Sequence, residues 1–301
     1  MMMLHSNDGQ PLHLCSISRL YGDGGRGEST LQAFEDQLVR GFGIEFDPNP
    51  CTDGWAVWHD GTMTRLTAGA DTRRLVDIPL AAVAGMCFGR GRVGTLDEVL
   101  SLIARHGNSE VPSAMHLKGE RQSPALRSSL IQVLRRHPQA VPKLFLFDVT
   151  EQTAVALHEA MPELALAPSI AHEYDVQRYN ASVHGTLWTL DAALNGARRG
   201  LFRWAWVDEW DLASDDAGGR KEPPFADTAT FEALHRAGLR VGVVTPELHA
   251  SSPGLLGGEA HEDAADQAKL FLRIRAIADS GFVDALCTDW PEEVKAMLPC
   301  A

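Results

Sequence analysis

The stretch GIEFDPNPCTDGWAVWHD, residues 43–60, decides the fold because it combines an apolar strand with acidic groups and an imidazole. Glu45 and Asp47 stand two residues apart, and successive side chains of a strand point to opposite faces. The two carboxylates therefore share one face. A proline-broken turn and a short aromatic strand are expected next, ending at His59 and Asp60. Taken alone, the stretch is either a solvated strand end or part of a metal site.

Strand-like and helix-like segments alternate along the rest of the chain. The predicted strands are residues 14–19, 42–47, 112–118, 143–149, 164–170, 201–208, 239–245 and 283–289. The predicted helices are residues 29–40, 96–105, 125–137, 151–161, 228–237 and 266–281. Strands this apolar indicate a parallel sheet covered by helices. Eight such units in 301 residues favour a closed (β/α)8 TIM barrel of the α/β class, with residues 1–301 forming a single domain.

Insertions are expected at the C-terminal rim of this barrel, where the chemistry of such folds takes place. They are a small hairpin and loop insertion at about 48–94 and the loops 209–224 and 249–266, whose role as lids or as unstructured segments stays open. Polar residues also gather at strand ends, namely Arg19, Glu45, Asp47, Lys118, Asp148, Asp208, Thr245 and Asp289. Each alone is explained by a helix cap or loop solvation, but together they indicate a site.

Composition narrows the class of partner. A net charge of -13, from 40 acidic and 27 basic residues, argues against nucleic acid or an anionic membrane surface. Five cysteines without CxxC spacing suggest neither a disulfide framework nor a thiolate zinc site. The first residues resemble no secretory signal, and no apolar run reaches the ~18 residues of a membrane span. We therefore expect a cytoplasmic protein with a small-molecule partner, and the sequence leaves open whether it forms a homo-oligomer.

Seven segments, in this order, resemble the glycerophosphodiester phosphodiesterase family of the phosphatidylinositol-phospholipase-C-like barrel group. They are GESTLQAF (27–34), similar to PENTLxAF, GIEFD (43–47), WHDGTMTRLT (58–67), similar to HDxxLxRxT, TLDEVL (95–100), the LK of MHLK (115–118), AGLRVGVVT (237–245) and CTDWP (287–291). The resemblance covers residues 17–294. It implies metal-dependent hydrolysis of a phosphodiester, most closely a glycerophosphodiester, to an alcohol and a phosphomonoester, with a role in lipid metabolism.

The resemblance also assigns roles position by position. It makes Glu45 and Asp47 metal ligands, His59 one member of an acid–base pair and Lys118 a phosphate contact. The metal implied is Mg²⁺ or Ca²⁺, which prefer hard carboxylate oxygens. A phosphodiester needs its nonbridging oxygens neutralised and a proton delivered to the leaving alkoxide, so these residue types suit the reaction.

Two positions depart from the family pattern. Arg19 stands where the family has the histidine of its first strand, and a guanidinium cannot act as a base, although it could bind phosphate together with Arg26. His116 replaces the third metal carboxylate. Imidazole suits Mn²⁺ or Zn²⁺ better than Mg²⁺ or Ca²⁺. Glu120 offers an alternative carboxylate from the following loop.

Further substrate contacts are predicted on the strand at 201–208. Trp206 and Asp208 share one of its faces, where they would line a substrate groove or, alternatively, where the tryptophan would belong to a core aromatic cluster.

Three functions are compatible with these residues. In the first, a metal-dependent phosphodiesterase uses His59 to protonate the leaving group while Lys118 and Arg19 hold the phosphate. In the second, the barrel is catalytically impaired or non-catalytic and keeps a phosphate and metal site. In the third, a lyase-type reaction lets a substrate hydroxyl attack its own phosphorus.

Overall fold

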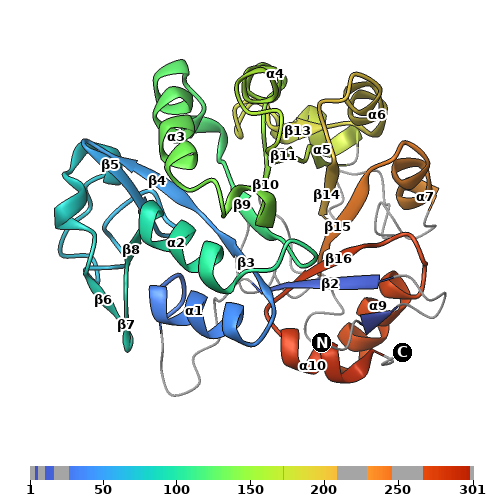
Figure 1. The fold of residues 1–301 in the computed structure, drawn as a ribbon, viewed down its shortest axis with the longest axis horizontal. Coiled ribbons are helices and arrows are strands. Elements are labelled where there is room, and N and C mark those ends of the chain that lie inside the picture. Colours follow the sequence, from blue (N-terminus) through green and yellow to red (C-terminus); the bar gives the residue numbers. More distant parts are fainter. Residues whose placement is uncertain are drawn as a thin grey trace. The chain divides into compact units, whose positions relative to one another are not determined.

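The structure is a computed structural model that describes residues 4–5, 11–16, 27–171, 173–208, 229–245 and 267–298 (Figure 1). The predicted loops at 209–224 and 249–266 lie outside these residues. The chain divides into two compact units. One contains Cys15–Leu146 and Ala156–Leu164, and the other contains Met1–Leu14, Phe147–Val155 and Ala165–Ala301.

The unit around Cys15–Leu146 carries the residues of the opening stretch. Its elements are the end of β2 (Pro11–Ser16), α1 (Leu31–Val39), β3 (Gly43–Phe46), β4 (Pro48–Cys51), β5 (Gly54–Val57), β6 (Cys87–Phe88), β7 (Gly91–Arg92), β8 (Gly94–Thr95), α2 (Leu96–His106), β9 (Ser113–His116), α3 (Pro124–Arg136) and β10 (Leu144–Phe147), with short 3-10 helices η1 (Leu75–Asp77), η2 (Leu80–Ala82), η3 (Gly119–Arg121) and η4 (Val141–Lys143). Strand β3 pairs in parallel with β2 and β9. All four residues of β3 are buried, as expected for a parallel strand covered on both faces.

The second unit repeats the alternation. Its elements are β1 (Leu4–His5), the start of α4 (Glu151–Ala160), β11 (Ala165–Leu166), β12 (Ser169–Ile170), α5 (Glu173–Tyr179), β13 (Leu187–Trp188), α6 (Leu190–Arg198), β14 (Trp204–Asp208), α7 (Ala229–Arg236), β15 (Arg240–Val244), α9 (Gln267–Ala278), β16 (Ala285–Thr288) and α10 (Pro291–Met297). Strands β13, β12, β14, β15 and β16 are hydrogen-bonded in that order, all in parallel. Parallel neighbours joined through helices are the pattern of an α/β fold.

Each predicted strand and helix overlaps an observed one, but the segments differ in detail. The predicted strand at 164–170 is split into β11 and β12 around Pro168, because proline has no backbone N–H to donate to a sheet. The short elements α5, β13, α6 and α10 were not predicted.

The prediction of a proline-broken turn after Asp47 is wrong. Pro48–Cys51 forms β4, which pairs antiparallel with β5, and β5 pairs in turn with β8. Strand β4 lies at the edge of this three-stranded sheet, where proline is tolerated because one side of the strand needs no donors. The aromatic strand also ends earlier than predicted, at Val57.

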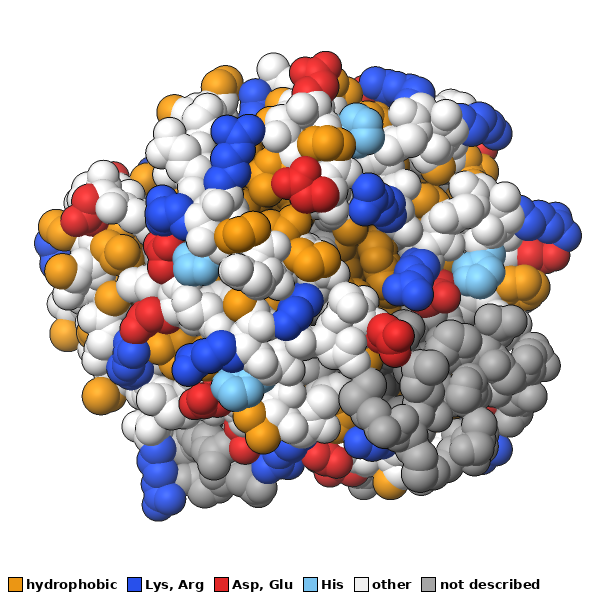
Figure 2. All heavy atoms as spheres, viewed as in Figure 1, with side chains coloured by type: hydrophobic (Ala, Val, Ile, Leu, Met, Phe, Trp, Pro, Cys, Tyr) orange, Lys and Arg blue, Asp and Glu red, His pale blue; other side chains and the backbone are white. Residues whose placement is uncertain are grey.

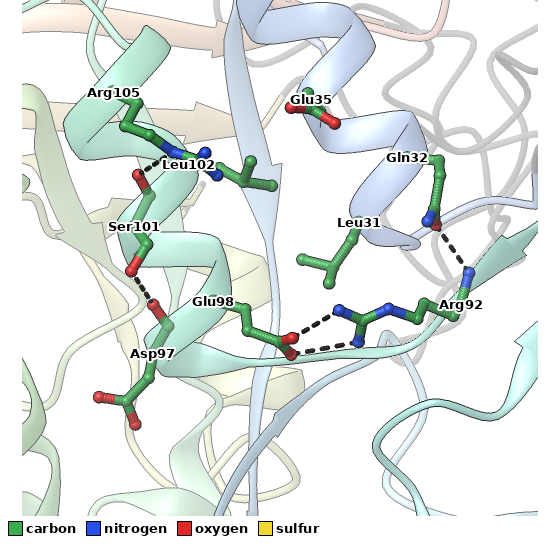
Figure 3. Close-up of a pocket in the computed structure, with 9 residues that line it drawn as sticks. All are labelled: Leu31, Gln32, Glu35, Arg92, Asp97, Glu98, Ser101, Leu102 and Arg105. Carbon is green, nitrogen blue, oxygen red and sulfur yellow. Dashed lines mark hydrogen bonds and ion pairs between the residues drawn. The ribbon is translucent and has the colours of Figure 1, made fainter.

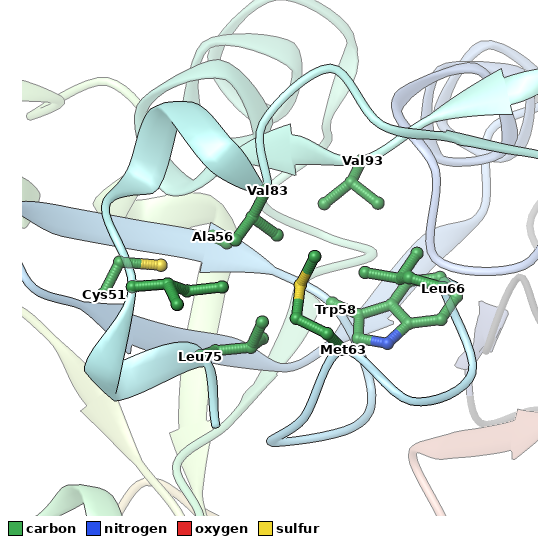
Figure 4. Packing of buried hydrophobic residues seen from close by; sticks show 9 residues of the cluster. Cys51, Ala56, Trp58, Met63, Leu66, Leu75, Val83 and Val93 are labelled. Atoms are coloured by element: carbon green, nitrogen blue, oxygen red, sulfur yellow. The ribbon is translucent and has the colours of Figure 1, made fainter. Parts of the chain in front are cut away.

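The insertion at 48–94 is built around its own apolar core (Figure 4). The buried members are Cys51, Ala56, Trp58, Met63, Leu66, Leu75, Ile78, Val83 and Val93, with Leu80, Met86 and Phe88 packed against them. The hairpin of β6 and β7 also approaches the loop before α1 so closely that a Cβ atom on Gly27 would clash with the carbonyl oxygen of Phe88. The insertion is therefore a packed part of its unit rather than an open lid.

Helix α2 begins as its sequence predicts. The backbone N–H of Glu98 donates to Oγ1 of Thr95 at 3.1 Å, and the N–H of Thr95 donates to Oε2 of Glu98 at 2.9 Å. These two bonds form a capping box, which satisfies two amide groups that the helix itself leaves without partners. Helix α2 therefore has a well-defined start directly after the insertion ends.

Candidate functional site

Two neighbouring strands bring three potential metal ligands together. Glu45 lies in β3, directly opposite Ala114 of β9, and Asp47 follows the end of β3. His116 is the last residue of β9. One ligand atom from each of the three side chains lies within 4.8 Å of the others, which makes them a candidate metal cluster among the described residues. Parallel strands ending at the same edge explain why residues 69 or more positions apart in the sequence meet here.

The donor atoms of this cluster suit a divalent cation. Nδ1 of His116 lies 3.0 Å from Oδ1 of Asp47 and 3.8 Å from Oε1 of Glu45. Both carboxylates are buried, Asp47 to 3% exposure. Two carboxylate groups this close repel each other unless a cation compensates them. Two carboxylate oxygens and one imidazole nitrogen suit Mn²⁺ or Zn²⁺ better than the harder cations Mg²⁺ and Ca²⁺.

Lys118 connects the carboxylates to the neighbouring loop. Its buried Nζ lies 3.1 Å from Oδ1 of Asp47 and donates to the backbone oxygen of His59 at 2.7 Å. Burial raises the pKa of Asp47, but the charges of Lys118 and His59, with the hydrogen bond and charge of His116, outweigh burial and hold the pKa well below its usual value. Asp47 is therefore ionised at neutral pH, as a metal ligand must be.

His59 is placed beside this cluster by the β4–β5 hairpin. The backbone N–H of Trp58 donates to the carbonyl oxygen of Asp47 at 3.1 Å, so the chain returns to Asp47 just before His59. The side chain of His59 is 22% exposed, and its Nδ1 lies 2.8 Å from Oδ1 of Asp60. The imidazole is thus held by a carboxylate and keeps access to solvent.

The remaining predicted residues are Arg19, Arg26, Trp206, Asp208 and the alternative ligand Glu120. Arg19 and Arg26 lie outside the described residues. Trp206 is 3% exposed and stacks on Phe147 with ring centroids 4.3 Å apart, as the core-cluster alternative expects, and its contact with substrate stays a prediction. Asp208 ends β14, where its backbone faces Val244 of β15. The alternative ligand Glu120 has a half-exposed side chain near the guanidinium of Arg121.

Three residues that were not predicted as site residues form a chain of contacts that ends at His59. They are Asp60, Arg65 and Glu28. Arg65 donates to both carboxylate oxygens of Asp60, from Nε at 2.8 Å and from Nη2 at 3.0 Å. Its Nη1 pairs with Oε1 of Glu28. The WHDGTMTRLT segment contains Asp60 and Arg65, and GESTLQAF contains Glu28, so the sequence carried a signal for each residue but none for their contact.

A separate pocket of about 340 Å³ lies between α1 and α2 (Figure 3). It is lined by Leu31, Gln32, Glu35, Arg92, Asp97, Glu98, Ser101, Leu102 and Arg105. The guanidinium of Arg92 is already bound by Glu98, with Nη2 2.5 Å from Oε1. The lining contains none of the predicted site residues, so this pocket gives no support to the predicted chemistry.

On the face shown in Figure 2, acidic and basic side chains are interspersed rather than gathered by sign. Within the part of the chain that the structure describes, no helix has the length and apolar character needed to cross a membrane.

Comparison with known proteins identifies similar structures. No protein-family model and no curated protein matches the chain. A glycerophosphodiester phosphodiesterase from Parabacteroides distasonis matches with a TM-score of 0.63 and 14% identity, over 95% of this chain and 96% of that one. One from Agrobacterium tumefaciens matches with a TM-score of 0.58 and 17% identity, over 95% and 99%. A phosphodiesterase from Oleispira antarctica, solved in complex with the product sn-glycerol-3-phosphate, matches with a TM-score of 0.59 and 17% identity, over 96% of both chains.

These matches extend over nearly the whole of each protein, so the likeness concerns the complete fold and not a local motif. They confirm the predicted fold class, since these neighbours are α/β TIM barrels. The chain therefore has the TIM-barrel fold of the glycerophosphodiester phosphodiesterases to which it is similar.

Proposed function

We propose that this protein is a metal-dependent phosphoric diester hydrolase whose substrate is a small-molecule phosphodiester, most closely a glycerophosphodiester. The observation that carries the proposal is the convergence of Glu45, Asp47 and His116 beside Lys118 and His59. Similar structures with the same fold include one bound to sn-glycerol-3-phosphate, which supports the substrate class.

Each side chain has a role that its geometry supports. Glu45, Asp47 and His116 would hold a divalent cation, which supplies positive charge to the nonbridging phosphate oxygens. Lys118 places a buried ammonium next to Asp47 and is proposed, with Arg19 and Arg26, as a phosphate contact. His59, partly exposed and oriented by Asp60, is proposed to deliver the proton that the leaving alkoxide needs.

The overall reaction balances as follows. The bond between phosphorus and the leaving oxygen breaks, the oxygen of water bonds to phosphorus, and the leaving oxygen takes up a proton from His59. One proton of the water stays on the phosphomonoester. The other passes to solvent, because Arg19 stands at the position of the family's first-strand histidine and cannot act as a base, and His59 regains its proton from solvent.

The presence of Arg19 in place of the family's first-strand histidine favours a second candidate function. This candidate is a catalytically impaired or non-catalytic barrel that keeps the phosphate and metal site. Loss of one proton-transfer group typically lowers a rate by ~10²–10⁴-fold and need not abolish turnover. We therefore place hydrolysis first. The lyase-type alternative shares the same residues and differs in its product.

A product assay separates these candidates. Protein stripped with a chelator is supplied with Mg²⁺, Ca²⁺, Mn²⁺ or Zn²⁺ and incubated with glycerophosphodiesters, and the phosphorus products are followed by ³¹P NMR. A phosphomonoester is the expected product. A cyclic phosphodiester product would support the lyase reaction in place of hydrolysis. If no product forms with any of the four metals, the non-catalytic barrel that binds phosphate and metal is supported instead. Arg73→Gln, an exposed residue of the insertion, serves as the active control.

The identity of the third ligand predicts metal preference. We expect His116→Glu to shift the ratio of Zn²⁺ to Mg²⁺ affinity by about 10–100-fold toward Mg²⁺, because a carboxylate replaces an imidazole in the ligand set. Titration calorimetry measures both affinities without relying on activity. The control His158→Glu makes the same exchange on α4 and should leave the ratio unchanged. An unchanged ratio in His116→Glu would exclude His116 from the ligand set.

The remaining expectations are part of the same proposal. We propose a single domain spanning residues 1–301 and a role in lipid metabolism. We also propose a cytoplasmic location, because the five cysteines are few and lack CxxC spacing.

A further inference from the structure

We propose that Arg65 is a positioning residue that holds Asp60 and, through Asp60, the imidazole of His59. The inference rests on the proposed function, in which His59 transfers a proton. Arg65 donates two parallel hydrogen bonds to the carboxylate of Asp60, from Nε to Oδ2 at 2.8 Å and from Nη2 to Oδ1 at 3.0 Å. Oδ1 of the same carboxylate lies 2.8 Å from Nδ1 of His59. A bidentate pair of this kind fixes direction as well as distance.

Arg65 is itself held from three sides. Its guanidinium lies over the ring of Trp58, 4.6 Å from the centroid, and 5.7 Å from the centroid of Phe88. The two rings meet edge to face at 4.9 Å. The third contact is the ion pair with Glu28, from the loop before α1. A guanidinium that packs against two aromatic rings and pairs with a second carboxylate has little freedom to leave Asp60.

The insertion core supplies this support. Trp58 belongs to that core, and Phe88 packs against it from the β6–β7 hairpin. The close approach of the hairpin to Gly27 keeps Phe88 next to the loop that carries Glu28. The insertion therefore contributes to the site by fixing the guanidinium of Arg65 next to Asp60, the partner of His59. The core residues named here do not belong to the metal cluster.

The chemical consequence concerns the tautomer of His59. A carboxylate is an acceptor, so a stable bond to Asp60 requires the proton of neutral imidazole to stay on Nδ1. As imidazolium, His59 then gives its Nε2 proton to the substrate and keeps the proton on Nδ1. Without Arg65 the side chain of Asp60, which is partly exposed, can turn toward water, and both tautomers of His59 become populated. The same logic applies wherever a carboxylate orients a histidine that transfers protons.

The test compares Arg65→Gln and Arg65→Lys with a matched control. Arg73 binds Asp71 through Nε and Nη2 in a similar fork, within the same insertion, and is 65% exposed, so Arg73→Gln removes an equivalent pair with no contact to His59. Four quantities are measured: kcat and KM for the diester, metal affinity by calorimetry, and the ¹⁵N NMR signals of the His59 ring, assigned by their loss in His59→Gln.

We expect Arg65→Gln to lower kcat by about 10–100-fold, the range found when a partner of a site residue is removed. KM and metal affinity should stay within twofold, and the ring signals should move toward a mixture of tautomers. Arg65→Lys should recover part of kcat, because lysine restores the charge without the fork. Asp60→Asn combined with Arg65→Gln should lose little more than Asp60→Asn alone, since both act through one carboxylate.

A folded Arg65→Gln protein with unchanged ring signals and kcat overturns the inference. If that variant does not fold, Arg65→Lys carries the same measurements, and unchanged ring signals in it count equally against the proposal. Failure of the proposed function looks different. A wild-type protein that releases no product, whose His59 ring nevertheless changes tautomer in Arg65→Gln, would disprove hydrolysis and leave the positioning role intact.

Discussion

Replacing His59 by glutamine lowers kcat for a glycerophosphodiester by about 10²–10⁴-fold, because the departing alkoxide then leaves without a positioned proton donor. Metal affinity remains, since the three ligand side chains are untouched. Glutamine retains a hydrogen-bonding side chain of similar length, so the β4–β5 hairpin should keep its structure. Steady-state kinetics and calorimetry on the same preparation check both parts.

The leaving group makes this prediction sharper. A p-nitrophenolate leaving group is stable as an anion and needs no proton, so bis-p-nitrophenyl phosphate should lose far less rate than the glycerol diester in His59→Gln. The difference between the two substrates isolates proton delivery from substrate binding. Equal losses on both substrates would show that His59 has another role.

The second large effect is expected at Asp47. Asp47→Asn should weaken metal binding by at least about 100-fold and bring hydrolysis to background, because a charged ligand becomes a neutral amide. It should also lower the free energy of unfolding of the metal-free protein. The ammonium of Lys118 is buried and 3.1 Å from this carboxylate, and breaking a buried pair from one side costs about 3–5 kcal/mol.

Glu45→Gln is the matched control for Asp47→Asn. It removes a ligand of the same cluster but leaves the pair of Asp47 and Lys118 in place. Metal affinity should therefore fall in both variants, whereas the loss of stability should be larger in Asp47→Asn. Equal stability losses in the metal-free variants would contradict the compensation of Lys118 by Asp47.

The pH dependence follows from the lowered pKa of Asp47. A carboxyl whose pKa is lower in the folded than in the unfolded protein adds stability above its unfolded pKa. This contribution is lost as the pH falls through the folded pKa. The stability difference between wild type and Asp47→Asn should therefore be full at neutral pH and shrink in acid, as measured by denaturant unfolding at several pH values.

The fold was largely predictable because its strands are apolar runs separated by helical periodicity, and such runs are typical of a parallel sheet covered by helices. The strands that were not predicted are either very short or contain residues that a strand normally excludes. Strand β13 has two residues, too few for any pattern, and β4 contains two prolines that are acceptable only because the strand lies at an edge. That exception depends on tertiary structure, which local propensity does not contain.

The candidate site was predictable where the ligands lie on strands. The spacing of Glu45 and Asp47 implies a shared face, and the family resemblance indicated His116, which the neighbouring parallel strand β9 brings to them. The chain of contacts from His59 to Glu28 was not predictable, because it depends on how the insertion folds around Trp58. The burial of Trp206 was left open for a similar reason, since strand alternation does not reveal which face meets another ring.

The hairpin of β4 and β5 has a consequence for how this protein can change in evolution. It joins Asp47 to His59 through paired strands of equal length, closed by the bond from Trp58 to Asp47. Deleting one residue within either strand would turn the following side chains to the opposite face and carry the imidazole away from the carboxylates. Length variation among descendants of this sequence should therefore avoid Pro48–Cys51 and Gly54–Val57, and collect in the turns of the insertion beyond them.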